Sequence, residues 1–127
     1  MIQNAPPLRN AAAGGLPQEE NNKLTTTDRL ETLKQFVEKD PKNSFALYGV
    51  AMEYAQRGEH DQAMEYFRKL WEVNPDYAYA YYHGGQVLAK MGNAEEARRA
   101  WEKGIEASRR TGDDHARSEL EAALSQL

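Results

Sequence analysis

The sequence predicts an all-α fold in which one helical hairpin is used twice, with a further helix before and after the pair. Two observations support this prediction. Large apolar residues recur at helical spacing from Leu30 onward, and the chain repeats itself with one fixed period. Eight identities fall on this one register, and Phe67 is matched by Trp101: Pro41 and Pro75, Ala46 and Ala80, Tyr48 and Tyr82, Ala55 and Ala89, Gly58 and Gly92, Ala63 and Ala97, Lys69 and Lys103, and Glu72 and Glu106.

The first element that the sequence predicts is a disordered tail over residues 1–25. This segment is rich in proline, glycine and asparagine and has few large apolar groups, so it cannot bury enough surface to offset the entropy of ordering. A helix is then expected over 27–39, because Leu33, Phe36 and Val37 continue the helical spacing that begins at Leu30. Asp40-Pro41 ends this helix.

Each hairpin consists of two predicted helices, 43–57 with 60–72 and then 77–91 with 94–110. The first helix of each carries one apolar stripe, and a glycine suited to the left-handed conformation follows it, with Asn93 able to cap the helix after Gly92. A small residue and an aromatic one follow in the second helix, where two helices approach closely. These positions are Leu47, Val50, Ala51, Tyr54, Gly58, Ala63 and Phe67, and then Tyr81, Gly84, Gly85, Leu88, Gly92, Ala97 and Trp101.

A last helix is expected over 114–126, started by Asp113 and Asp114 after Gly112. Its inner face is predicted to consist of Leu120, Ala123, Leu124 and Leu127.

These residues resemble the tetratricopeptide repeat, a helix–turn–helix unit of about 34 residues, which is the spacing of Pro41 and Pro75. The resemblance implies an α-α superhelix, or solenoid, of two full repeats at about 44–77 and 78–111, with an N-terminal half-repeat helix and a capping helix at about 113–127. The repeat domain would then cover residues 26–127.

Two positions depart from the family pattern. Leu70 replaces a small residue, which predicts looser packing after the first repeat, and Arg109 replaces the closing proline, which predicts a helix that runs on.

Composition and charge exclude several classes of function. The chain has no cysteine, so disulfides, thiolate catalysis and Cys-based metal sites are ruled out. A net charge of −4 disfavours nucleic acid and anionic membranes as partners. The first residues lack a secretory pattern and no apolar run is long enough to span a membrane, so a cytoplasmic protein is expected.

The sequence does not suggest an enzyme. None of the three histidines has a second ligand at the spacing of a zinc site, and no serine, threonine or lysine has an evident activating partner. We therefore expect a non-enzymatic protein without a metal or a cofactor.

One set of residues remains as a candidate binding site, on the side of the first helix of each hairpin that the core stripe does not use. In the family this side lines the concave surface, which implies an aromatic groove for a peptide segment of a partner protein, rimmed by Gln56 and Lys90 and extended by Leu120. The chain would then be an adaptor, scaffold or assembly factor. The candidate residues are Phe45, Tyr48, Met52, Tyr79, Tyr82 and Gln86.

The family and the exposed apolar residues suggest two other roles for this surface. The apolar surface could instead be buried in a homodimer, which would make the chain a structural self-association module. The family also contains a subclass that grips the C-terminal carboxylate of chaperones through a lysine and an asparagine. Tyr48 and Met52 stand at those two positions, so a receptor of that type is not expected.

Overall fold

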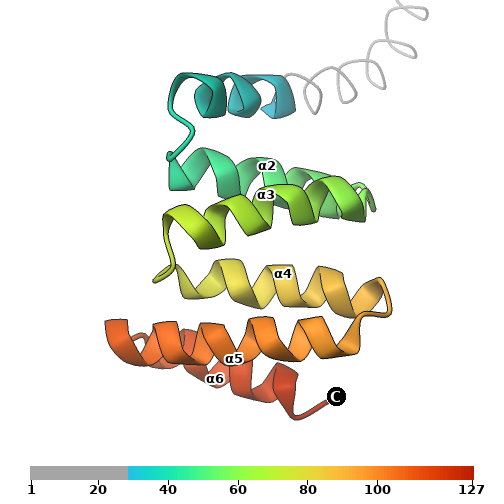
Figure 1. Cartoon of the computed structure of the whole chain (residues 1–127), viewed down its shortest axis with the longest axis vertical. Coiled ribbons are helices and arrows are strands. Elements are labelled where there is room, and N and C mark those ends of the chain that lie inside the picture. Colours follow the sequence, from blue (N-terminus) through green and yellow to red (C-terminus); the bar gives the residue numbers. More distant parts are fainter. Residues whose placement is uncertain (1–28) are drawn as a thin grey trace, which may run out of the picture. The chain divides into compact units, whose positions relative to one another are not determined.

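The computed structural model describes residues 29–127, and the predicted tail over 1–25 lies outside them. A helix over 29–39 is followed by α2 (Ser44–Gln56), α3 (His60–Val73), α4 (Ala78–Lys90), α5 (Ala94–Thr111) and α6 (Asp114–Leu124) (Figure 1). Residues 29–127 contain no strand. The bounds of α2 to α6 agree closely with the predicted ones, and the largest difference is that α6 ends at Leu124 rather than at position 126. The packing of the helices is described for the compact unit Leu33–Leu127.

Local side-chain chemistry accounts for where the helices begin and end. Asn43 caps α2 by accepting a hydrogen bond from the Ala46 backbone amide at 3.1 Å, and Asp113 caps α6 in the same way. Glycines with positive φ separate the helices: Gly58 at 76° follows α2 and Gly92 at 87° follows α4, as predicted. Asn93 stands at the cap position of α5, but its side chain makes no capping hydrogen bond, so that detail of the prediction was wrong.

The helices stack in chain order, and each one from α2 to α6 packs against the next (Figure 1). Alternate helices also touch, since α2 contacts α4 and α4 contacts α6. The chain therefore forms two layers, with α2, α4 and α6 in one and α3 and α5 in the other. We call the side of the molecule formed by α2, α4 and α6 the even-helix face.

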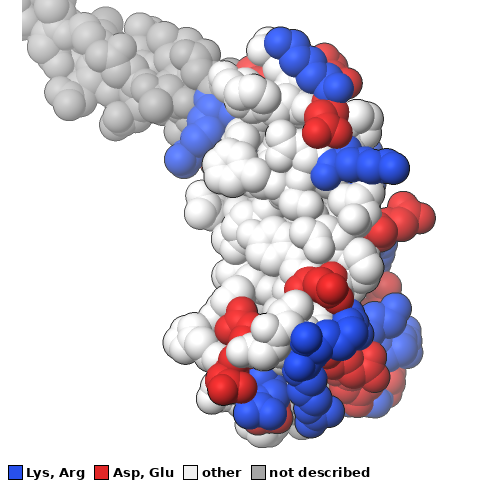
Figure 2. Space-filling view, turned by 90° about the vertical axis from the view of Figure 1, so that its left-hand side faces the viewer, with Lys and Arg blue, Asp and Glu red and all other residues white. Residues whose placement is uncertain are grey.

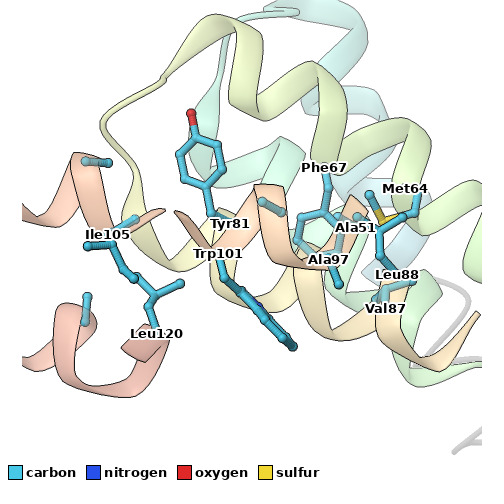
Figure 3. Close-up of a cluster of buried hydrophobic side chains, with 14 of the residues drawn as sticks. Ala51, Met64, Phe67, Tyr81, Val87, Leu88, Ala97, Trp101, Ile105 and Leu120 are labelled. Carbon is cyan, nitrogen blue, oxygen red and sulfur yellow. The ribbon is translucent and has the colours of Figure 1, made fainter. Parts of the chain in front are cut away.

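The main core lies between the two layers (Figure 3). Ala63 and Ala97 are fully buried in it, and Phe67 and Trp101 fill the space one turn later, as predicted. Close approach of two indole rings to the helix explains the paired glycines in α4. A Cβ on Gly85 would overlap the Trp101 indole, and a Cβ on Gly84 would lie 2.5 Å from Cζ2 of Trp71.

Three expectations from the sequence are corrected by this packing. Leu120 is not part of the surface groove: it is fully buried above Gly104 of α5, whose missing side chain leaves the space that Leu120 fills. Leu127 lies beyond the end of α6 and is 53% exposed, so it is not on the inner face of that helix. Leu70 is fully buried in a cluster with Leu47 and Ala80, so its larger side chain does not loosen the packing after the first hairpin. The prediction that α5 runs on through Arg109 is confirmed.

Candidate functional site

Five rings on the even-helix face form a cluster, which we call the aromatic cluster: Tyr48, Tyr77, Tyr79, Tyr82 and His83. The Tyr48 ring of α2 lies 5.2 Å from Tyr77, the residue before α4, and 5.9 Å from His83 of α4. Within α4, the His83 ring lies 5.0 Å from Tyr82 and 6.3 Å from Tyr79. His83 therefore joins the tyrosine of α2 to the two tyrosines of α4.

Helical spacing alone explains why three of these rings come together. Tyr79, Tyr82 and His83 stand at i, i+3 and i+4 of α4, so they share one side of that helix. The other side of α4 carries Gly84, Gly85 and Leu88 into the core. The aromatic rings are consequently held by a rigid helix while part of their surface stays accessible to solvent.

Burial shapes the protonation of two members of the cluster. Burial lowers the pKa of His83, while a hydrogen bond with Gln86 and the charge of Glu119 act in the opposite direction. The imidazole is thus uncharged at neutral pH. Burial also raises the pKa of Tyr48 to about 12, with smaller contributions from Tyr77 and Tyr79. Both effects keep the centre of the cluster uncharged.

Helix α6 and the residue before it place ionisable side chains beside the aromatic cluster. The pKa of Tyr79 is raised by burial, by the negative charges of Glu119 and Asp113, and by a hydrogen bond with Glu119. Glu119 also lies 2.7 Å from Nε2 of His115, and the His115 ring is 6.3 Å from that of Tyr79. These contacts connect α4 to α6 on the even-helix face.

Two hollows flank α4 on the same face. The smaller one, of about 160 Å³, lies between α2 and α4 and is lined by Met52, Ala55, Gln56, His60, His83, Gln86, Val87 and Lys90. The larger one, of about 470 Å³, lies between α4 and the C-terminal residues and is lined by Tyr82, Gln86, Ala89, Lys90, Trp101, Ala122, Ala123, Gln126 and Leu127. Gln86 and Lys90 line both, so they form the wall that the hollows share.

The structure distributes the six predicted site residues over this surface. Tyr48, Tyr79 and Tyr82 belong to the aromatic cluster. Met52 lines the smaller hollow, while Gln86 lines both hollows and donates a hydrogen bond from Nε2 to the Tyr82 hydroxyl at 3.1 Å. Phe45 stands apart: it is 75% exposed and takes part in none of the ring contacts within residues 29–127.

Sequence reasoning missed several residues that shape this face. Tyr77 was treated only as the start of a helix, although its ring touches Tyr48. His83 is not among the predicted groove residues, whereas it is the centre of the ring contacts. The C-terminal wall of the larger hollow was also missed. The i, i+4 spacing of Tyr79 and His83 was a usable signal for His83, but no spacing predicts contacts between α4 and the residues after α6.

A third hollow, of about 590 Å³, lies between α3 and α5 in the other layer. Seven of its ten lining residues are charged, and several pair with one another or with neighbours, as Lys69 does with Glu65 and Arg68 with Glu96. Exposed charge pairs of this kind contribute little energy. The even-helix face is the stronger candidate because its hollows combine aromatic and aliphatic surface with few charges.

The distribution of charge over the surface is uneven. Figure 2 shows one side of the molecule, on which a stretch without charged side chains lies at the centre and left, while charged side chains gather near the two ends and along the right-hand edge. Residues 29–127 hold no group of three or more histidine, aspartate or glutamate side chains placed to bind a metal ion. Within the same residues, none of the helices combines the length and the apolar character that crossing a membrane requires.

Comparison with known families returns two overlapping matches. The family model described as "TPR repeat" matches residues 52–92, and the one described as "Tetratricopeptide repeat" matches residues 78–111. Both fall on the hairpins that the register of the repeat defines.

The chain is also similar to individual proteins and solved structures, among them one named as a tetratricopeptide repeat domain protein. The photosystem I assembly protein Ycf3 of Acaryochloris marina is 36% identical over 63 residues, which are 48% of this chain and 38% of the relative. The chain thus spans well under half the length of this relative. A tetratricopeptide repeat domain protein from Salinibacter ruber is 30% identical with a TM-score of 0.63, covering 66% of this chain and 93% of that one. The Yersinia enterocolitica translocator chaperone SycD shares the fold, with a TM-score of 0.75 at 13% identity over 88% of this chain and 84% of that one.

Proposed function

Because the chain belongs to the tetratricopeptide repeat family, we propose that it is a protein-interaction module whose even-helix face binds a peptide segment of a partner protein. We assign this role to the repeat region predicted over residues 26–127. One observation carries the proposal. The aromatic cluster adjoins two hollows on the same face, and Gln86 and Lys90 form the wall between these hollows.

The composition of this surface supports binding rather than a purely structural role. Tyrosine is enriched at the centres of interfaces, where it offers a large apolar ring, a hydroxyl and few rotatable bonds. Tyr48, Tyr79 and Tyr82 are each only partly buried, so the rings keep surface that a partner can cover. A relative is named as an assembly protein, and holding a segment of a partner is one way in which a repeat domain could contribute to assembly.

Truncation of the rings tests the proposal. Tyr82→Ala and Tyr48→Ala are expected to weaken a bound peptide by about 2 kcal/mol or more, in the range of interface hot spots, while the melting temperature changes little. A peptide selected on the full chain from a library of short random sequences serves as the probe, with binding measured by calorimetry. Tyr54→Ala is the matched control, because Tyr54 pairs with Tyr66 at 5.9 Å and lines neither of the two hollows.

A specific outcome would contradict the proposal. If Tyr82→Ala and Tyr48→Ala both leave peptide affinity unchanged while Tyr54→Ala lowers it, binding takes place elsewhere. Unfolding of the two variants would show that the rings are part of the core, and it would remove the separation between binding and stability on which the proposal depends.

One observation favours a second candidate, self-association. Phe45 is 75% exposed and Phe36 is 46% exposed, and both rings offer apolar surface for a second copy of the chain to cover. Light scattering on the full chain decides between the two candidates. A dimer of about twice 14.4 kDa that becomes a monomer in Phe45→Ser supports self-association, because an isologous contact uses both copies of the residue. A monomer at all concentrations excludes it.

A further inference from the structure

Lys90 occupies a distinctive place on the even-helix face. It is the last residue of α4 and lines both hollows together with Gln86. Apart from this lysine, the residues that line the two hollows include no lysine, arginine, aspartate or glutamate. A single lysine therefore stands at the junction of two depressions that no other lysine, arginine, aspartate or glutamate side chain lines.

Lys90 also differs from most other cations in the part of the chain that the structure describes. Arg68 pairs with Glu96 and Arg110 with Asp76, at 2.9 Å and 2.7 Å. Lys90 is exposed and has no carboxylate within ion-pair distance among residues 29–127. Its ammonium group is thus available to a ligand.

A role in helix stability does not account for this lysine. A cation in the last turn does interact favourably with the helix dipole, and Lys90 is the basic residue in the last turn of α4. The equivalent position of the first hairpin, one repeat earlier, is Gln56, and α2 has no basic residue in its last turn. The first hairpin therefore forms without a charge at this position.

The walls of the larger hollow indicate what would accompany an acid on the ligand. Apart from Lys90, they consist of aromatic and aliphatic side chains with two glutamines, and they include Trp101, Ala89 and Leu127. Such walls bury an apolar side chain favourably. An acidic group beside that side chain would then meet Lys90 at the rim, where a charge pair contributes to selectivity and to the rate of association more than to affinity.

Resting on the proposed function, we infer that the even-helix face selects peptide segments in which a large apolar residue stands close to an aspartate or glutamate. The apolar side chain occupies the hollow between α4 and the C-terminal residues, and the carboxylate pairs with Lys90.

Selection of peptides on matched variants tests this inference. Short random peptides, displayed with both ends joined to the carrier so that no free terminus is present, are selected on the full wild-type chain. The same selection is made on Lys90→Glu and on the control Lys103→Glu, a reversal at an exposed lysine that lines the hollow between α3 and α5. We expect aspartate and glutamate to be enriched next to a large apolar residue for wild type and Lys103→Glu, and to be replaced by lysine or arginine for Lys90→Glu.

A gain of charge sharpens the test. Gln56 lines the smaller hollow together with Lys90, so Gln56→Lys should bind a selected acidic peptide about fivefold more tightly at low salt, within the range of an exposed charge pair. That gain should disappear at high salt, because exposed charges are screened.

The possible failures are distinguishable. If peptides bind and Tyr82→Ala abolishes their binding, but wild type shows no preference for acidic residues, the inference is wrong and the proposed function stands. If Lys90→Glu keeps the acidic preference, the inference is also wrong. If acidic peptides bind only when they carry a free C-terminal carboxylate, the side-chain acid is the wrong source. If no selected peptide depends on Tyr82, the proposed function fails and the inference fails with it.

Discussion

The two hairpins place different pairs of side chains at the same contact. In the first hairpin Ala51 of α2 and Phe67 of α3 share the core, and one repeat later Gly85 of α4 and Trp101 of α5 stand at the same positions. The larger ring of the second hairpin is matched by the smaller residue on the facing helix. A Cβ at position 85 would overlap the Trp101 indole, whereas the first hairpin keeps a methyl group there.

The two hairpins therefore keep a similar space between their helices, although different residues fill it. Core interiors are close-packed, so a gain of volume on one side of a contact requires a loss on the other. Trp101 gains a further anchor that a phenylalanine lacks, because its Nε1 donates a hydrogen bond to the Tyr82 carbonyl oxygen at 3.0 Å. The second hairpin is therefore the more specialised of the two.

The largest loss of stability is expected from removing the Trp101 ring. Trp101→Ala should lower the free energy of unfolding by about 3–5 kcal/mol, because removing the buried indole leaves a cavity beside two helices and the Tyr82 carbonyl oxygen loses the indole N–H as a hydrogen-bond donor. Urea unfolding followed by circular dichroism measures the loss. A change of less than about 1 kcal/mol would mean that α4 and α5 close the space by moving together.

A smaller effect is expected from adding volume on the facing helix. Gly85→Ala should destabilise the wild-type chain by about 1–3 kcal/mol, because the new methyl group overlaps the indole. In a Trp101→Phe background, which reproduces the pair of the first hairpin, the same change should cost much less or stabilise α4, since alanine is the better helix former.

The double-mutant cycle supplies the control for that prediction. A favourable coupling energy between Gly85→Ala and Trp101→Phe is expected, because the residues are in contact. Additive effects would show that the two positions do not compete for one space, and the comparison between the hairpins would lose its physical basis.

Sequence reasoning recovered the helices and the core because both depend on local pattern. Gly58 and Gly92 mark where helices end, and the apolar stripes identify the buried sides. It placed Leu120 on the inner face of the last helix, but it did not predict that the missing side chain of Gly104, on another helix, provides the space that Leu120 fills. Contacts between helices follow from packing angles and distances, which the period of the repeat does not specify.

The candidate site, too, could be predicted from the sequence only where it depends on local pattern. The tyrosines of α4 share a side because of their spacing within one helix. The contact of Tyr48 with Tyr77 and the wall formed by Gln126 and Leu127 join elements whose relative position is set only by the folded chain. Sequence therefore identified residues on the face but not the hollows between them.

A second difference between the hairpins lies on the even-helix face. Gly49 of α2 and His83 of α4 occupy equivalent positions. A Cβ at Gly49 would lie 2.9 Å from Cδ1 of Leu33, so a side chain there would have to displace Leu33, whereas the second hairpin places a ring at the centre of the aromatic cluster. Only the second hairpin can therefore respond to pH at this position.

The smallest expected effect is the response of stability to acid through His83. Burial lowers its pKa in the folded chain, whereas in the unfolded chain it takes up a proton near pH 6.5. As the pH falls below that value, the unfolded state binds more protons than the folded state, so stability decreases until the folded pKa is reached. Tyr48, Tyr79, Tyr82, Gln86 and Glu119 surround the ring, and of these the Glu119 carboxylate opposes the shift by favouring the imidazolium.

His83→Gln should therefore lose less stability than wild type between neutral pH and about pH 5. Urea unfolding at both pH values measures the difference, and titration of groups that both chains share cancels in the comparison. His60→Gln is the matched control for removing one imidazole, since His60 begins α3 and touches no ring of the aromatic cluster. Equal losses in wild type and His83→Gln would show that the ring at position 83 takes up its proton as readily in the folded chain as in the unfolded one. The centre of the aromatic cluster would then present a positive charge to a partner in mild acid, whereas a lowered pKa keeps it uncharged.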